Sequence, residues 1–140
     1  MKRFVLLTMF VVSSFSSQIN VEKKIYKMIF SALFPSNSVV KVWSDEPSKT
    51  FIFASMKKVK LVKSQNNADI LMLYHNEEID TNNKIVFANG YLVFQRKKGK
   101  AVGGFYWQKG RPNLIFVKKI LQKKGIVLPD NLKKYIEDIK

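Results

Sequence analysis

Residues 101–117 of this 140-residue chain are AVGGFYWQKGRPNLIFV. The two flanks, AVGGFYWQ and NLIFV, are rich in aromatic and aliphatic residues, and KGRP lies between them. Two such runs around a stretch with glycine and proline predict a β-hairpin, with Lys109–Pro112 as its turn. Gly103 and Gly104 would allow a kink or a close approach of another segment.

A phosphate-binding loop and a nucleic-acid platform are two other interpretations of this stretch. A Walker-type loop needs Gly-Lys-Ser/Thr at the start of a helix, whereas Lys109 and Gly110 are followed by Arg-Pro, which removes an amide donor. A stacking platform needs its aromatics on one face. On a strand Phe105 and Trp107 point to one face and Tyr106 to the other, so at least one face is expected in the core. The hairpin interpretation is favoured.

The tip of this hairpin is the candidate binding site of the chain. Aromatic side chains and arginine are enriched at the centres of interfaces. The candidate partner- or ligand-binding residues are therefore Tyr106, Trp107, Lys109 and Arg111. The alternative is plain packing of the aromatics beneath a solvated turn.

The N-terminus, MKRFVLLTMFVVSSFSSQ, has the layout of a secretory signal peptide. Lys2 and Arg3 precede an apolar run to Val12, and Ser14 and Ser16 stand at the two positions that a signal peptidase recognises. We expect cleavage after Ser16 and export to a bacterial periplasm. An uncleaved anchor is the alternative, although the run is shorter than the ~20 residues that span a bilayer. No cysteine stands in a lipoprotein position.

Hydrophobic patterns predict the remaining elements of a single domain over residues 17–140. Strands are expected in the apolar or alternating stretches at 39–43, 58–62, 70–74 and 84–88. Helices are expected at 21–34, 117–125 and 128–139, the second ending at Gly125. Residues 51–56 and 88–95 fit either a helix or a strand. The first helix is expected to bury Val21, Ile25, Met28, Ile29, Ala32 and Leu33.

This order of elements predicts an α/β fold: a single-domain sandwich with a mixed β-sheet flanked by helices, a late hairpin and two C-terminal helices. The mature chain is long enough for one hydrophobic core. Because it contains no cysteine, the fold must be held by packing alone.

The net charge of +15 is concentrated in the second half of the chain. Residues 84–140 hold fourteen Lys or Arg against three acids, and residues 17–83 hold nine against seven. Such a field attracts anionic partners. The alternative is a lysine-rich composition without function, because the lysines are scattered over several elements.

Catalysis finds little support in the sequence. With one histidine and no cysteine, Cys/His metal sites are excluded and a Ser/His/Asp triad would depend on His75. His75 follows the strand at 70–74, where α/β proteins often bind ligands, but HNEEIDTNN indicates a solvated loop. Glu77 and Glu78 are adjacent and tend to point apart, and Asp80 lies near them. We expect no enzyme, no catalytic residues, no metal and no cofactor.

Several stretches resemble, in sequence order, the YfiR-like family of periplasmic proteins. They are the helix end Leu33-Phe34-Pro35 before VVKVW, the strands ADILMLY and KIVFA, the hairpin VGGFYWQKGRPNLIFV and the closing KKILQKKGIVLPDNLKKYI. The resemblance covers residues 24–139. It implies a regulator that represses or tunes a membrane-bound diguanylate cyclase or related sensor. Family members often carry cysteines that couple redox state to repression, and this chain has none, so regulation here would use ligand binding or docking.

The leading hypothesis is therefore a non-catalytic regulatory protein of the periplasm that docks on the extracytoplasmic domain of a membrane sensor through its first helix and hairpin tip. A periplasmic module for a small anionic solute is the alternative, and a domain adhering to membrane or cell-wall polyanions is a third. We expect no nucleic-acid partner and no membrane span after processing, and a homodimer is left open.

Overall fold

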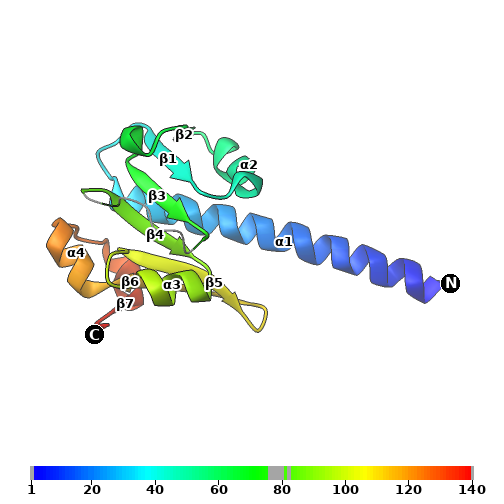
Figure 1. The fold of residues 1–140 in the computed structure, drawn as a ribbon. Helices are drawn as coiled ribbons and strands as arrows, with labels where there is room; N and C mark the ends of the chain where they lie inside the picture. The colour runs from blue at the N-terminus through cyan, green and yellow to red at the C-terminus, as the bar shows by residue number, and fades with distance from the viewer. Residues whose placement is uncertain (1, 76–80, 82, 140) are drawn as a thin grey trace.

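The computed structural model describes residues 2–75, 81 and 83–139, with side chains from residue 18 onward. The chain forms a seven-stranded sheet with flanking helices (Figure 1), which confirms the predicted α/β fold. The helices are α1 (Lys2–Leu33), α2 (Thr50–Ala54), α3 (Tyr91–Lys97) and α4 (Lys118–Lys124). The strands are β1 (Val40–Ser44), β2 (Val59–Leu61), β3 (Ile70–Leu73), β4 (Ile85–Asn89), β5 (Gly103–Gln108), β6 (Arg111–Val117) and β7 (Ile136–Glu137).

The strand order in the sheet is β2-β1-β3-β4-β5-β6-β7. Neighbours from β2 to β5 are parallel, β6 runs antiparallel to β5, and β7 is parallel to β6, so the sheet is mixed as predicted. The chain moves outward from β1 to β2 and then crosses back to β3. The order therefore reverses between β1 and β3, and sheets of this kind bind ligands at the carboxyl ends of such strands.

Helices α1 and α3 cover opposite faces of the sheet. The Tyr26 ring of α1 lies 5.0 Å from the Phe53 ring of α2 and 5.9 Å from the Phe105 ring of β5, centroid to centroid. Phe94 of α3 instead stacks on Tyr106, which follows Phe105 and so points to the other face. We call the two sides the α1 face and the α3 face.

The predicted apolar stripe of the first helix is partly confirmed. Ile29, Ala32 and Leu33 are buried, and Val21 and Ile25 are half-buried. Met28 was predicted to face the core but is 38% exposed, so this prediction is wrong. Tyr26 and Phe30 are buried in addition, because they lie three to four residues from other buried positions of α1 and so belong to the side that faces the sheet.

The strand at the middle of the core is the apolar run predicted for residues 70–74. All four residues of β3 are fully buried. Strands of a parallel sheet covered on both faces are apolar at every position rather than at alternate ones. The prediction of a buried strand is confirmed.

The two ambiguous segments are both mainly helical. Residues 51–56 begin within α2, and residues 88–95 contain the end of β4 followed by α3. Gly90, with φ of 118°, allows the abrupt change from strand to helix. The Phe94 ring of α3 occupies the space where a side chain at Gly104 would stand, and a side chain at Gly103 would meet the Ile115 carbonyl. The close approach predicted for the glycine pair is confirmed.

Two boundaries differ from the sequence prediction. The hairpin turn is Lys109–Gly110 only, because Arg111 pairs with Gln108 and Pro112 with Trp107 as part of the ladder. The closing segment forms a 3-10 helix, η3 (Asp130–Tyr135), and then β7, rather than a regular helix over 128–139. Its end is extended because Ile136 pairs with Phe116 of β6, a contact that sequence periodicity does not reveal.

Among the residues that the structure describes, no helix combines the length and apolarity needed to cross a bilayer.

Candidate functional site

The β5–β6 hairpin extends beyond the carboxyl edge of the sheet, on the side toward which the first half of α1 also projects (Figure 1). Its turn residues have positive φ values, 52° for Lys109 and 75° for Gly110. This pair of values is typical of a type I′ turn, which favours Asn-Gly. Lys109 therefore adopts a left-handed backbone conformation that glycine or asparagine usually occupies.

The ladder distributes the four predicted binding residues over both faces and the tip. Tyr106 and Arg111 point to the α3 face, because Arg111 is paired with Gln108, two positions after Tyr106. Trp107 points to the α1 face. Lys109 is at the apex. The structure thus brings Tyr106 and Arg111 together and separates them from Trp107.

An exposed apolar surface adjoins Tyr106 on the α3 face. The Tyr91 ring packs edge-on against Tyr106 with centroids 5.3 Å apart, and Tyr91 is still 49% exposed. Leu92, the next residue of α3, is 66% exposed. We call the surface formed by Tyr91, Leu92, Tyr106, Lys109 and Arg111 the hairpin patch.

Neither cation of the hairpin patch has a charged partner within the described part of the chain. Both Lys109 and Arg111 are exposed, and neither side chain makes a hydrogen bond or ion pair there; the Asn113 side chain donates only to the Arg111 backbone carbonyl. Two free cations beside half-exposed aromatics have the composition of an interface centre.

On the α1 face, Trp107 is held against the first helix. Its indole Nε1 donates a hydrogen bond of 2.8 Å to Oε1 of Glu22, and its ring lies edge-on to Phe105 at 5.9 Å. Both the indole and Glu22 are half-buried. This contact fixes the hairpin relative to α1.

A buried polar cluster lies deeper along the same edge. The Tyr26 hydroxyl donates to Oδ1 of Asn89 over 2.9 Å and lies 3.1 Å from the Tyr74 hydroxyl. Asn89 Nδ2 is directed to the Leu73 and Phe87 carbonyls, each at 3.4 Å. Burial is the main cause that raises the pKa of both Tyr26 and Tyr74 above the ordinary tyrosine value. The polar groups of Tyr26, Tyr74 and Asn89 thus find their hydrogen-bond partners within this cluster and the neighbouring backbone.

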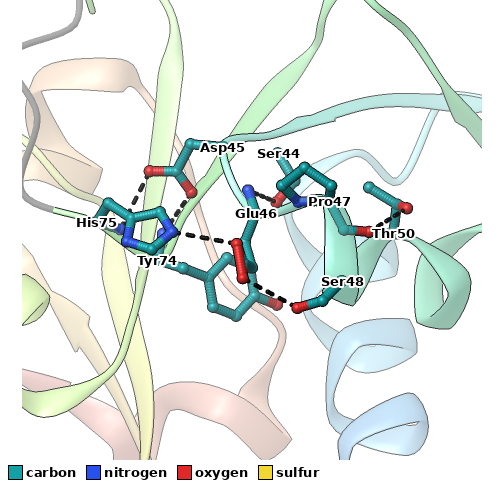
Figure 2. A network of polar contacts seen from close by, with 8 residues as sticks. All are labelled: Ser44, Asp45, Glu46, Pro47, Ser48, Thr50, Tyr74 and His75. Atoms are coloured by element: carbon teal, nitrogen blue, oxygen red, sulfur yellow. Dashed lines mark hydrogen bonds and ion pairs between the residues drawn. The ribbon is translucent and has the colours of Figure 1, made fainter.

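The carboxyl ends of β1 and β3 are joined by a second network, shown in Figure 2. Asp45 accepts hydrogen bonds from the backbone amides of Tyr74 (2.7 Å) and His75 (3.1 Å). Glu46 Oε2 lies 3.2 Å from His75 Nε2, and Glu46 Oε1 accepts from the Ser48 hydroxyl over 2.9 Å. The hydrogen bond with His75, followed by that from Ser48, lowers the pKa of the Glu46 carboxyl.

The order of these three side chains differs from that of a hydrolytic triad. In a triad the histidine stands between the hydroxyl and the carboxylate, so that it can take the hydroxyl proton. Here Glu46 stands between Ser48 and His75, and the Ser48 hydroxyl donates to the carboxylate instead (Figure 2). The arrangement caps and links two strand ends. The predicted loop position of His75 at the end of the strand is confirmed.

Metal ligands were not expected from the sequence. Within the part of the chain that the structure describes, no three His, Asp or Glu side chains are grouped so that they could hold a metal ion. The acids noted beside His75, namely Glu77, Glu78 and Asp80, lie outside the described residues.

Sequence reasoning missed several residues of this edge. Glu22 is the only acidic residue among the first 44, and this isolated charge could have marked it as a residue with a specific partner. Tyr26 could have been found at helical spacing from Ile29 and Phe30. The exposure of Tyr91 and Leu92 could have been predicted only if residues 91–97 had been assigned as a helix that buries Val93 and Phe94.

No known protein-family model matches this chain, and no curated protein matches it. The resemblance to YfiR-like proteins therefore stays a prediction from the sequence.

Proposed function

We propose that the protein is a non-catalytic regulatory module of the periplasm that docks on the extracytoplasmic part of a membrane-bound sensor, such as a diguanylate cyclase or a sensor kinase. The observation that carries the proposal is the hairpin patch. It presents two half-exposed tyrosines, an exposed leucine and Arg111 on the α3 face, with Lys109 beside them at the apex. Docking would favour one state of the sensor, and a signal that changes docking would change its output.

The support beneath the patch suits a docking role. Trp107 and Glu22 tie the hairpin to α1, and Phe94 packs against Tyr106 from behind. A surface held in place before binding loses less conformational entropy when its partner arrives.

The polar groups of the carboxyl edge favour binding over chemistry. Asp45 is committed to two backbone amides, and Glu46 separates the nearby hydroxyl from the imidazole. Among the described residues of this edge, Asp45 and Glu46 are thus employed in linking strand ends, which supports a binding role.

The experiment uses the absence of cysteine from the chain. In Lys109→Cys the only thiol is at the hairpin apex, and it can carry a photoactivatable cross-linker in cells that express the full-length protein. Lys119→Cys, on the exposed side of α4, is the matched control. We expect the apex variant alone to cross-link to an integral membrane protein with an extracytoplasmic sensor domain.

Charge reversal supplies the functional readout. For the double variant K109E/R111E the thiol is placed at Gln108 instead. The reversed charges should reduce cross-linking from position 108 and should alter the second-messenger level or the kinase output. Cross-linking of equal strength from positions 109 and 119, or an unchanged output in the double variant, would remove the hairpin patch as a docking surface. The N-terminal residue of the exported protein tests the expected cleavage after Ser16.

A further inference from the structure

A cavity of about 620 Å³ lies between the second half of α1 and the segment that joins α2 to β2. It is at the amino ends of β1 and β2, since Val40 and Val59 line it. The hairpin patch is at the carboxyl end of β5, so the two surfaces are on opposite edges of the sheet. The volume falls within the range of roughly 300–1,000 Å³ that is usual for small-molecule sites.

The inner surface of the cavity is apolar. Phe30 and Val40 are buried, and Phe34, Met56 and Val59 are half-buried around them. A hydrocarbon group placed against these side chains would be removed from water, which is the main source of affinity for apolar ligands.

The outer surface of the same cavity is positively charged. Its lining includes five lysines and no acidic residue: Lys23, Lys24, Lys27, Lys57 and Lys58. None of the five side chains makes an ion pair or hydrogen bond within the described residues. Four are exposed and Lys23 is half-buried, so the charges surround the opening rather than the interior.

The two kinds of surface are arranged along α1. Lys23, Lys27 and Phe30 are separated by four and three residues, which places them on one side of the helix. Phe34 directly follows α1, and its amide still donates to the Phe30 carbonyl over 2.9 Å, so it continues the same side. Charge therefore gives way to aromatic surface over roughly 16 Å of helix. An elongated ligand with an anionic head and an apolar tail matches this gradient.

The opposite wall of the cavity is held by backbone hydrogen bonds. Val40 donates to the Lys58 carbonyl over 2.8 Å, and Met56 donates to the Phe53 carbonyl over 3.0 Å. The segment carrying Lys57 and Lys58 is thus attached to β1 and α2. The cavity is formed by elements of the fold rather than by a free loop.

We propose that this cavity binds an amphipathic anion with a single alkyl chain, its carboxylate or phosphate head among the five lysines and its tail against Phe30, Phe34 and Met56. Charge complementarity selects the head, and the apolar inner surface selects the tail. A flat anionic surface, such as a bilayer, would contact the lysines and leave the interior empty. The proposal goes beyond the docking function and does not depend on it.

Calorimetric titration of the full-length protein with dodecanoate and with dodecyl phosphate, below their micelle concentrations, tests this site. We expect saturable binding of one molecule per chain for at least one of the two. Acetate, inorganic phosphate and neutral dodecyl maltoside should bind at least about tenfold more weakly, because each lacks the head or the tail.

Two variants separate the head from the tail. K24E/K27E reverses two charges at the opening, and Ser31→Trp places an indole in the cavity from an exposed position of α1. Each should weaken dodecanoate at least about tenfold, whereas K118E/K119E on α4 should not change it. Thermal unfolding of each variant controls for the fold.

Several results would overturn the proposal. They are no binding by the wild type, unchanged dodecanoate affinity in Ser31→Trp, and binding of inorganic phosphate as tight as that of dodecyl phosphate. Binding to vesicles of phosphatidylglycerol without binding of either monomeric probe would assign the lysines to a membrane surface instead.

Discussion

Trp107 and Glu22 are 85 positions apart in the chain and are joined by a hydrogen bond of 2.8 Å from the indole Nε1 to the carboxylate Oε1. The bond connects the hairpin to α1 at the edge where the candidate docking surface lies. Both side chains are half-buried, so water competes less for this hydrogen bond than it would at a fully exposed site.

Removal of either partner of this bond should destabilise the protein. Glu22→Ala and Trp107→Phe should each lower the free energy of unfolding by about 1 kcal/mol through the lost hydrogen bond, with an added packing loss in the second. The double variant should cost less than the sum of the two, with a coupling of about 0.5–1 kcal/mol. Urea denaturation of the three variants measures this coupling, and strict additivity would show that the bond contributes nothing in solution.

A side chain at Gly104 should be poorly tolerated. In Gly104→Ala the new methyl group would overlap the Phe94 ring, so α3 would have to shift from the sheet. Overpacking of this kind costs about 1–3 kcal/mol. Gly99→Ala is the matched control, since a methyl group there meets no atom within 4 Å. Equal thermal midpoints for the two variants would contradict the close packing of α3 on β5.

Tyr26, which is buried, and Tyr74, which is half-buried, should make the fold sensitive to alkali. The folded state raises the pKa of Tyr26 and Tyr74 above the ordinary value of 10.0, chiefly through burial. Their contribution to stability is complete below pH 10.0 and is lost as the pH rises above it, because the unfolded chain then releases protons that the folded chain retains.

A comparison of the wild type with the double variant Tyr26→Phe/Tyr74→Phe tests whether the two tyrosines cause this loss of stability at high pH. The double variant should be less stable at neutral pH, because Asn89 Oδ1 loses its donor, but should lose less free energy of unfolding across pH 10.0. Parallel stability curves for the two proteins through that range would contradict a raised tyrosine pKa.

Because Lys109 has a left-handed backbone conformation, replacing it with asparagine should raise stability and weaken docking. Asparagine fits a left-handed turn position better than lysine, so Lys109→Asn should stabilise the hairpin by up to about 1 kcal/mol. If Lys109 contacts the sensor, the same variant should weaken the cross-link to the sensor that forms from a thiol at Gln108.

Two further variants separate charge from backbone strain. Lys109→Gln removes the charge without relieving the turn, so it should weaken docking and leave the thermal midpoint almost unchanged. Gly110→Ala adds a side chain at a φ of 75° and should lower the midpoint. Full docking by Lys109→Gln would show that the apex charge has no role.

Local sequence was sufficient where a segment carries its own pattern. The buried strand at 70–73, the paired runs around Lys109 and Gly110, and the glycine that ends α4 were all recognisable. Short helices were not: α2 and α3 have five and seven residues, which is too few for a helical period to be distinguished from an apolar strand.

The candidate site depended on the tertiary structure more than the fold did. The amino-acid sequence by itself determined an α/β domain with a mixed sheet, a late hairpin and a cationic surface, because alternation, turn chemistry and charge are properties of neighbouring residues. Only the tertiary structure decided that Tyr106 and Arg111 share a face with Tyr91, that Glu22 meets Trp107, and that five lysines surround one apolar cavity. Those relationships follow from strand order and helix placement, which are set by packing between segments far apart in the chain.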